Sequence, residues 1–214
     1  MTRIFAGMLI AALMAATSSI QAEDVKEVVL MGDLNPVEQG WKKTGKLDSK
    51  PGKIGEKTVI ILDDQSTTDA VSYRIKIPKA MAIASQKGFE MTVTMMIAQK
   101  KQSKQSNGIE IRVAGQRVVF NLHNDGKNQS VRFWDPKLKK HIIGKIEGKD
   151  TLNSWKITYQ PETGLELSVN GKKVAVPFST LKGEGNYIAI GGISGLAKER
   201  IGTVSIENLT FKTL

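Results

Sequence analysis

Six polar or aromatic residues alternate with apolar residues between positions 109 and 134, as in strands that bury one face. They are Glu110, Arg112, Asn121, His123, Arg132 and Trp134. On one face of a sheet these side chains could bind a sugar. The indole would stack on a sugar ring, amide and carboxylate oxygens would bind hydroxyl groups, and guanidinium groups would bind a carboxylate or sulfate. The sequence therefore predicts a ligand-binding face made of these six residues.

The strand register decides whether these side chains meet. A two-residue turn at Gly115-Gln116, with glycine first as a type II′ turn requires, would pair Glu110 with Asn121. Matching apolar residues across the loop 124–129 would pair Asn121 with Arg132, so we expect a row of these three residues. The alternative is a solvated outer face, where alternating polar residues and a cross-strand Glu–Arg pair need no ligand.

Catalysis at this face is an alternative function. Glycoside hydrolysis needs two carboxylates about 5 to 10 Å apart. A hairpin closed by residues 99–107 would pair Glu110 with about Met96, which leaves Glu90 roughly 20 Å away at about 3.3 Å per residue. A hydrolytic pair is therefore not expected.

A lyase would instead need a base and a group that neutralises a carboxylate. His123 and either Arg112 or Arg132 could supply them. Lone histidines in strands are more often ordinary polar positions, so we expect binding without catalysis. A polysaccharide hydrolase or lyase is kept as the alternative.

Metal sites are weakly indicated. Asp63, Asp64 and Asp69 could offer oxygen ligands to a structural calcium ion, although their spacing is not that of an EF-hand. The chain has no cysteine, which excludes thiolate metal sites and disulfides. We expect no other cofactor.

Period-2 alternation runs through most of the chain and predicts an all-β protein. One short helix is expected at 79–87. The predicted strands cover residues 58–62, 71–77, 89–98, 109–113, 118–123, 131–134, 155–159, 165–169, 173–176, 187–191 and 204–211. Strands of this number and spacing indicate a two-sheet antiparallel jelly-roll sandwich.

The C-terminal half carries a more specific pattern. Trp155-Lys156-Ile157-Thr158-Tyr159 is followed by the segment 164–174, whose Asn170-Gly171 suits a type I′ hairpin, and then by Tyr187-Ile188-Ala189-Ile190-Gly191-Gly192 and the strand 204–211. This succession resembles the concanavalin A-like lectin/glucanase superfamily, especially laminin G-like domains and the lectin-like domains of sialidases. The resemblance implies a jelly roll but no single activity, because that superfamily includes lectins, hydrolases, lyases and structural modules. The Glu-x-Asp-x-x-Glu strand of its glucanases is absent.

Residues 1–22 have the layout of a secretory signal peptide. Arg3 precedes the apolar stretch 4–16, and small or polar residues lead to a cleavage site after Ala22. The apolar stretch, roughly 13 residues, falls short of the about 20 that a membrane-spanning helix needs. We expect one β-sandwich domain at 23–214, secreted or periplasmic, with no membrane span.

The charge points to an acidic partner. The chain has 31 Lys and Arg against 21 Asp and Glu, for a formal net charge of +10. Its basic segments lack the interleaved aromatic residues that stack on bases, so nucleic acid is not expected. The function that fits best is a secreted or periplasmic, lectin-like carbohydrate-binding module, and the charge favours acidic glycans as its ligands. An envelope domain that binds another protein is the further alternative.

Overall fold

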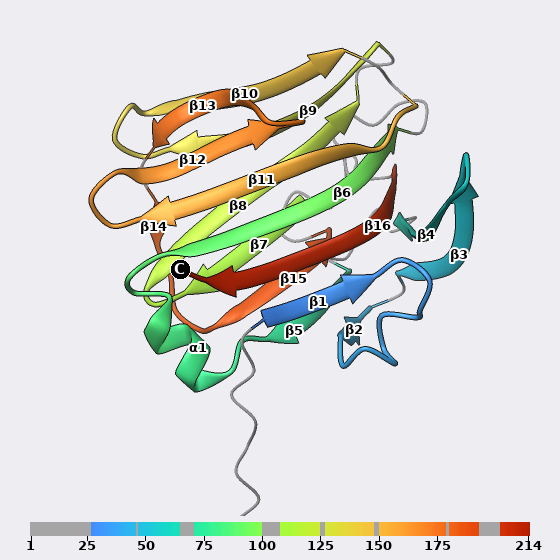
Figure 1. Ribbon diagram of the computed structural model, residues 1–214, viewed down its shortest axis with the longest axis horizontal. Coiled ribbons are helices and arrows are strands. Elements are labelled where there is room, and N and C mark those ends of the chain that lie inside the picture. Colours follow the sequence, from blue (N-terminus) through green and yellow to red (C-terminus); the bar gives the residue numbers. More distant parts are fainter. Residues whose placement is uncertain are drawn as a thin grey trace, which may run out of the picture.

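The computed structural model describes residues 27–45, 47–64, 71–99, 108–124, 127–147, 150–178, 180–192 and 202–214. Its strands form two sheets that lie face to face, and every strand pairing in them is antiparallel (Figure 1). The predicted all-β, two-sheet jelly-roll sandwich is therefore confirmed. Residues 1–26 lie outside the described part, so the signal peptide at 1–22 and the domain boundary at 23 stay predictions. No helix in the described ranges is long and apolar enough to cross a membrane.

The first sheet, sheet A, has the order β13-β12-β11-β6-β16-β4-β3, and β1 also pairs with β16. Its strands are β1 (Glu27–Met31), β3 (Asp48–Ile54), β4 (Lys57–Asp64), β6 (Phe89–Gln99), β11 (Asn153–Gln160), β12 (Gly164–Val169), β13 (Lys172–Phe178) and β16 (Gly202–Thr213). A short helix, α1 (Lys79–Ala84), lies at one end of the sandwich near the C-terminus, within the helix predicted at 79–87 (Figure 1).

The second sheet, sheet B, has the order β10-β9-β8-β7-β15-β5-β2, and β14 also pairs with β8. Its strands are β2 (Lys42–Thr44), β5 (Ser72–Lys76), β7 (Gly108–Val113), β8 (Gln116–Asn124), β9 (Asn128–Asp135), β10 (Lys140–Glu147), β14 (Leu181–Lys182) and β15 (Tyr187–Gly191). This sheet carries all six residues of the predicted ligand-binding face.

The core lies between the sheets and follows the predicted alternation. On β7 and β8 the buried apolar side chains are Ile109, Ile111, Val113, Val118, Phe120 and Leu122. On β11, Trp155 and Ile157 are buried and Tyr159 packs against the core. Because successive side chains of a strand point to opposite faces, the residues between these face outward, away from the other sheet.

The predicted hairpin over 99–107 is wrong, because β6 and β7 lie in different sheets. Strand β6 pairs with β11 on one side and β16 on the other, so it has no edge left for β7. Glu90, on β6, therefore faces outward on sheet A, whereas Glu110 faces outward on sheet B. The expectation that they cannot form a catalytic pair holds for a different reason.

The turn between β7 and β8 also differs from the prediction. Ala114 and Gly115, with φ of 52° and 79°, occupy the turn in place of Gly115 and Gln116. Positive φ at both positions is the type I′ geometry. The unfavourable conformation of Ala114 is held by tertiary bonds, since its N–H donates to Asn186 Oδ1 at 3.2 Å and the Gly115 carbonyl accepts from the Gly183 N–H at 3.0 Å.

The altered turn moves the pairing of β7 and β8 by two residues. Glu110 lies opposite Val119 and not opposite Asn121, and Arg112 lies opposite Arg117. A shift of two preserves which residues share a face, so the six predicted side chains still face the same way. The other predicted turn, Asn170-Gly171, has positive φ at both positions, as expected for type I′.

Candidate functional site

The outer face of sheet B divides the predicted residues into two groups. Asn121 lies opposite Arg132, as predicted, and His123 lies opposite Ser130. Trp134, near the end of β9, is 42% exposed. Glu110 and Arg112 form the second group, on β7. The predicted row of Glu110, Asn121 and Arg132 does not exist, because the β7–β8 register differs.

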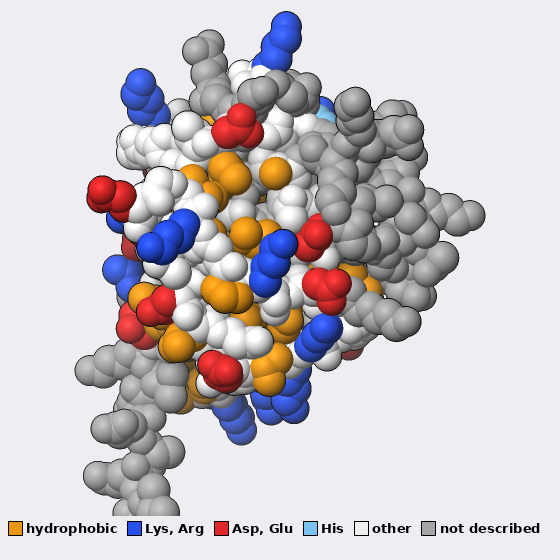
Figure 2. All heavy atoms as spheres, turned by 90° about the vertical axis from the view of Figure 1, so that its right-hand side faces the viewer, with side chains coloured by type: hydrophobic (Ala, Val, Ile, Leu, Met, Phe, Trp, Pro, Cys, Tyr) orange, Lys and Arg blue, Asp and Glu red, His pale blue; other side chains and the backbone are white. Residues whose placement is uncertain are grey.

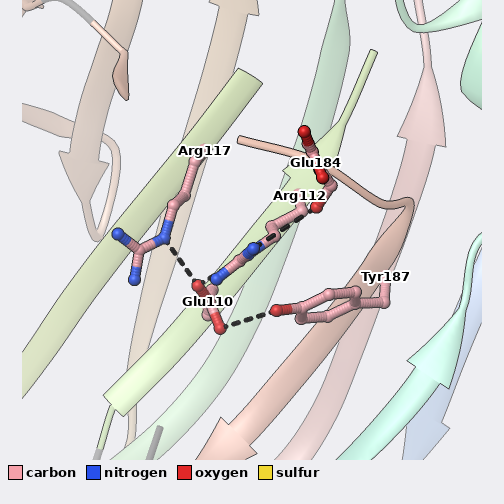
Figure 3. A network of polar contacts seen from close by, with 5 residues as sticks. All are labelled: Glu110, Arg112, Arg117, Glu184 and Tyr187. Carbon is pink, nitrogen blue, oxygen red and sulfur yellow. Dashed lines mark hydrogen bonds and ion pairs between the residues drawn. The ribbon is translucent and has the colours of Figure 1, made fainter. Parts of the chain in front are cut away.

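Glu110 is the centre of a polar cluster that the sequence did not predict. Its carboxylate is only 3% exposed, although it lies on the outer face. Arg112 Nε donates to Oε1 at 2.9 Å and Arg117 Nε donates to the same oxygen at 2.7 Å. Tyr187 donates its hydroxyl to Oε2 at 3.1 Å. Figure 3 shows how these side chains, which come from β7, β8 and β15, converge on the one carboxylate.

Electrostatics keeps this cluster ionised. Burial alone would raise the pKa of Glu110, but the hydrogen bonds from Arg117 and Arg112 and their positive charges outweigh burial, so the pKa lies below its usual range. Burial and the charge of Glu110 raise the pKa of Tyr187, which keeps its hydroxyl protonated and able to donate. Glu110 is thus ionised at neutral pH, with donors on both oxygens.

The bonds to Glu110 fix the orientation of the guanidinium groups of Arg112 and Arg117. Each uses its Nε to bind Glu110, so the terminal amino groups are directed elsewhere. In Figure 3 those of Arg117 lie on the side of the guanidinium away from Glu110. Arg112 directs one amino group to the Glu184 carbonyl at 3.4 Å. Both side chains are a little over a quarter exposed, at 27% and 28%, and so can meet a ligand.

Strand register arranges the charged residues of this face in two adjacent lines. The first, the Arg112 line, crosses β5, β15, β7 and β8 through three successive pairings and consists of Lys76, Tyr187, Arg112 and Arg117. The second, the Glu110 line, crosses β2, β5, β15, β7 and β8 and consists of Lys42, Arg74, Ala189, Glu110 and Val119. Five cations and one carboxylate therefore share a continuous surface.

A cleft of about 540 Å³ opens where the two lines reach β5 and β2. Its described lining contains three cations and no carboxylate: Gly40, Lys42, Thr44, Arg74, Ile75, Lys76, Asn186 and Tyr187. The guanidinium carbon of Arg74 lies 4.2 Å from the centre of the Tyr187 ring, and that of Arg112 lies 5.3 Å from it. Figure 2 shows Lys and Arg side chains gathered at the lower edge of the molecule, at the height of β2 and β5 in Figure 1.

The Asn121–Arg132 pair adds a second polar feature. Asn121 Oδ1 and Arg132 Nε are buried and have no hydrogen-bond partner among the described residues. One is an acceptor and the other a donor, so each has an unused capacity for a hydrogen bond beneath the surface of the sheet.

Sequence reasoning missed five residues of this site, namely Lys42, Arg74, Lys76, Arg117 and Tyr187. Arg117 could have been found, because it belongs to the same alternating pattern as Asn121 and stands beside the turn. The other four come from β2, β5 and β15. These strands lie near β7 only because segments distant in sequence pair with one another. Local sequence patterns do not predict such pairings.

The predicted calcium site cannot be assembled from the described residues. Asp63 and Asp64 end β4, but the side chain of Asp64 and all of Asp69 lie outside the described part. Within that part, no group of three or more His, Asp or Glu residues could hold a metal ion. The calcium ion stays a prediction.

Comparison with known proteins identifies the fold. No protein-family model matches the chain, and no curated protein is significantly similar in sequence. A carbohydrate esterase of the Shiga toxin-encoding bacteriophage phi24B is similar in structure, with a TM-score of 0.64, 10% identity, and coverage of 87% of this chain and 97% of the phage protein. A protein of unknown function from Shewanella oneidensis MR-1 has a TM-score of 0.56 and 12% identity over 87% of this chain and 85% of that protein.

Botulinum neurotoxin type C, which depends on two ganglioside molecules to get into cells, has a TM-score of 0.55 and 10% identity. The match covers 88% of this chain and 48% of the neurotoxin chain. Identities this low show a shared fold alone. The β-sandwich implied by the sequence resemblance is therefore confirmed, and membership of the concanavalin A-like superfamily stays a prediction.

Proposed function

We propose that this protein is an exported, lectin-like carbohydrate-binding module that binds an acidic glycan on the outer face of sheet B. One observation carries the proposal: five cations stand in two adjacent lines beside a single carboxylate, and that carboxylate is buried and already paired. The surface therefore keeps an unneutralised surplus of positive charge. Such a surplus attracts anions.

A glycan is the acidic partner that the other features favour. The cleft has the volume of a small-ligand site, and Thr44 and Asn186 add hydroxyl and amide groups to its cations. The exposed Trp134 offers a ring face on the same side of the sheet. A carbohydrate esterase and a ganglioside-dependent toxin share the fold, which supports carbohydrate as the ligand class.

Binding without catalysis is favoured by the state of Glu110. A carboxylate that donates or accepts a proton in catalysis needs a pKa tuned towards the working pH. The pKa of Glu110 is instead lowered, and both its oxygens are occupied by Arg112, Arg117 and Tyr187. Glu110 is suited to hold the arginines in place.

Affinity electrophoresis of the purified protein tests the proposal. The gels contain polygalacturonate or a sulfated glycan as acidic probes and dextran as the neutral one. We expect retardation by an acidic probe and none by dextran. Replacing both Arg74 and Lys76 with glutamine should weaken binding about ten-fold or more, because contacts to charged groups contribute more than neutral ones.

The matched control is a double variant on the other sheet, Lys156→Gln with Lys173→Gln. It removes the same charge from the outer face of sheet A, where both lysines are about half or more exposed. Equal loss in both double variants would mean that net charge, and not the sheet B face, attracts the glycan. Absence of retardation by every acidic probe, with the protein shown to be folded, would overturn the proposal.

A further inference from the structure

We infer that the ligand is a linear polysaccharide whose oxyanion groups, carboxylate or sulfate, recur along the chain, and that it lies across the strands along the Arg112 line. A single acidic sugar at a chain end would not use this line. The inference rests on the proposed function and narrows it to a class of glycan.

The first argument is that the cations repeat along one direction. Lys76 pairs with Tyr187, Tyr187 pairs with Arg112, and Arg112 pairs with Arg117. Adjacent strands lie about 4.8 Å apart, so Lys76 is roughly 10 Å from Arg112 and roughly 14 Å from Arg117 along the line. One acidic group cannot contact both ends of such a line, but groups repeated along a polymer can.

The second argument concerns the residue in the middle of the line. Tyr187 carries the Arg74 guanidinium over its ring at 4.2 Å and the Arg112 guanidinium at 5.3 Å, and its hydroxyl is bound to Glu110. The ring and the hydroxyl of Tyr187 are therefore both in contact with protein side chains, and Tyr187 lies between the cations. The surface thus has two cationic positions separated by an aromatic side chain. One is Lys76 with its neighbour Arg74 from the Glu110 line, and the other is Arg112 with Arg117.

The third argument is that the Arg112–Arg117 position is built for an oxyanion. Both guanidinium groups are anchored through Nε to one carboxylate oxygen, so they are oriented before any ligand arrives. Their remaining amino groups can donate paired hydrogen bonds to a carboxylate or a sulfate. Pre-oriented donors lower the entropy that binding would otherwise cost.

The two ends of the line differ. Strand β14 pairs with β8 at Gln116 and Arg117, and a Cβ on Gly183 would come within 2.5 Å of the Arg117 Cβ, so the chain closes this end tightly. At the other end the cleft opens beside Lys76, Arg74 and Lys42. A bound polymer would therefore continue through the cleft towards β2.

Calorimetry with uronate oligomers of increasing length tests the inference. We expect the monosaccharide to bind weakly and affinity to rise about ten-fold or more once an oligomer spans both cationic positions, because the second contact becomes intramolecular. Lys76→Gln should abolish most of that gain, because it removes the cation that the far end of the oligomer would contact. Lys76 is exposed and forms no ion pair with another residue that the structure describes, so the variant is expected to fold.

The control is Lys173→Gln on sheet A, which should keep the full gain with length. Sulfated oligomers of matched length form a second arm, and the acidic group that gives the larger gain identifies the chemistry. A monosaccharide that binds as tightly as the oligomers, or a gain with length that survives Lys76→Gln, would overturn the inference while leaving the proposed function intact. If no acidic saccharide of any length binds, the proposed function itself fails.

Discussion

Each sheet carries on its outer face one glutamate bound by two cations, and the two clusters differ in almost every other respect. On sheet A, Glu90 is bound by Lys156 at 2.7 Å and Lys212 at 3.3 Å. On sheet B, Glu110 is bound by Arg112 at 2.9 Å and Arg117 at 2.7 Å. The lysines are 48% and 50% exposed, whereas the arginines are 27% and 28% exposed.

The surroundings of the two glutamates explain the difference. The line across sheet A that contains Glu90 runs Lys212, Glu90, Thr158, Glu166, and so contains both signs of charge. Lys173 in turn binds Glu166 on the same face. The Arg112 and Glu110 lines of sheet B contain one carboxylate among five cations. Sheet A thus has a balanced, solvated surface, and sheet B has an organised cationic one.

The net charge of +10 does not by itself indicate where a ligand binds. The arrangement of the charged residues on the two sheets does. Lysines on a solvated face hold a carboxylate loosely and contribute little to stability. Arginines anchored on a buried carboxylate are rigid and can present donors to a ligand. Four predictions test whether this distinction is real.

The largest expected effect is on stability. Glu110→Gln should lower the free energy of unfolding by about 3 kcal/mol, because it leaves two adjacent guanidinium groups without their common anion. Glu90→Gln should cost less than about 1 kcal/mol, since its lysines remain in water. Urea denaturation of both variants measures the difference. Equal losses would show that the two clusters are equivalent and would remove the basis of the comparison.

Low pH should remove most of the stability difference between the wild type and Glu110→Gln. The pKa of Glu110 in the folded protein lies below its ordinary value of 4.5, so its ionised form stabilises the fold at pH values above about 4.5. That stabilisation is lost as pH falls through the lower, folded-state pKa. The gap in unfolding free energy between wild type and Glu110→Gln should therefore be constant near neutral pH and shrink in acid. A gap that does not change down to strongly acidic pH would contradict an ionised Glu110.

Exchanging the type of cation should have a smaller effect. Arg117→Lys keeps the charge but loses the planar group that donates from Nε, and should cost about 1 to 2 kcal/mol. The reciprocal change on sheet A, Lys212→Arg, should alter stability by a few tenths of a kcal/mol at most. Thermal or urea unfolding of the pair measures both. If Arg117→Lys is as neutral as Lys212→Arg, the rigidity assigned to the arginines is wrong.

The smallest effect is expected from one hydroxyl group. Tyr187→Phe removes the donor to Glu110 Oε2 and should cost about 1 kcal/mol. Tyr159→Phe on sheet A is the matched control, because the Tyr159 ring stacks on Phe89 at 5.2 Å and its hydroxyl forms no hydrogen bond to a described residue. The control should be nearly neutral in the same denaturation assay. Similar values for the two variants would mean that the Tyr187 hydroxyl does not support the cluster.

The sequence predicts the fold well because local alternation controls it. Strands with a buried face, such as β6, β7, β8 and β11, repeat apolar residues with period two and were all expected. The strands that were not expected, β1, β2, β3, β10 and β14, include short and edge strands. Strand β3, for example, has the sequence Asp-Ser-Lys-Pro-Gly-Lys-Ile. Because its side chains are exposed or half-buried, the sequence has no apolar alternation that would predict a strand.

The site was predicted less well, for a physical reason that one turn illustrates. The face of each side chain depends only on the parity of its position, so the six residues were placed on one face. Their neighbours depend on the turn, where Ala114 has positive φ and its N–H donates to Asn186, 72 residues away. A contact so distant in sequence leaves no local pattern. The role of Glu110 changed accordingly, from a ligand-binding group to the anchor of Arg112 and Arg117.

The bonds around Glu110 have a consequence for the order of folding. Glu110 and Tyr187 are 77 residues apart, and the bonds from Arg112 to Glu184 and from Ala114 to Asn186 each span 72 residues. Closing loops of this length is slow and entropically unfavourable until most of the structure is present. The cationic surface therefore forms only after β7 has paired with β15, and a chain that lacks this pairing does not display it. A ligand that binds only this surface stabilises the native state by mass action, so the upward shift of the unfolding temperature with ligand concentration measures its affinity.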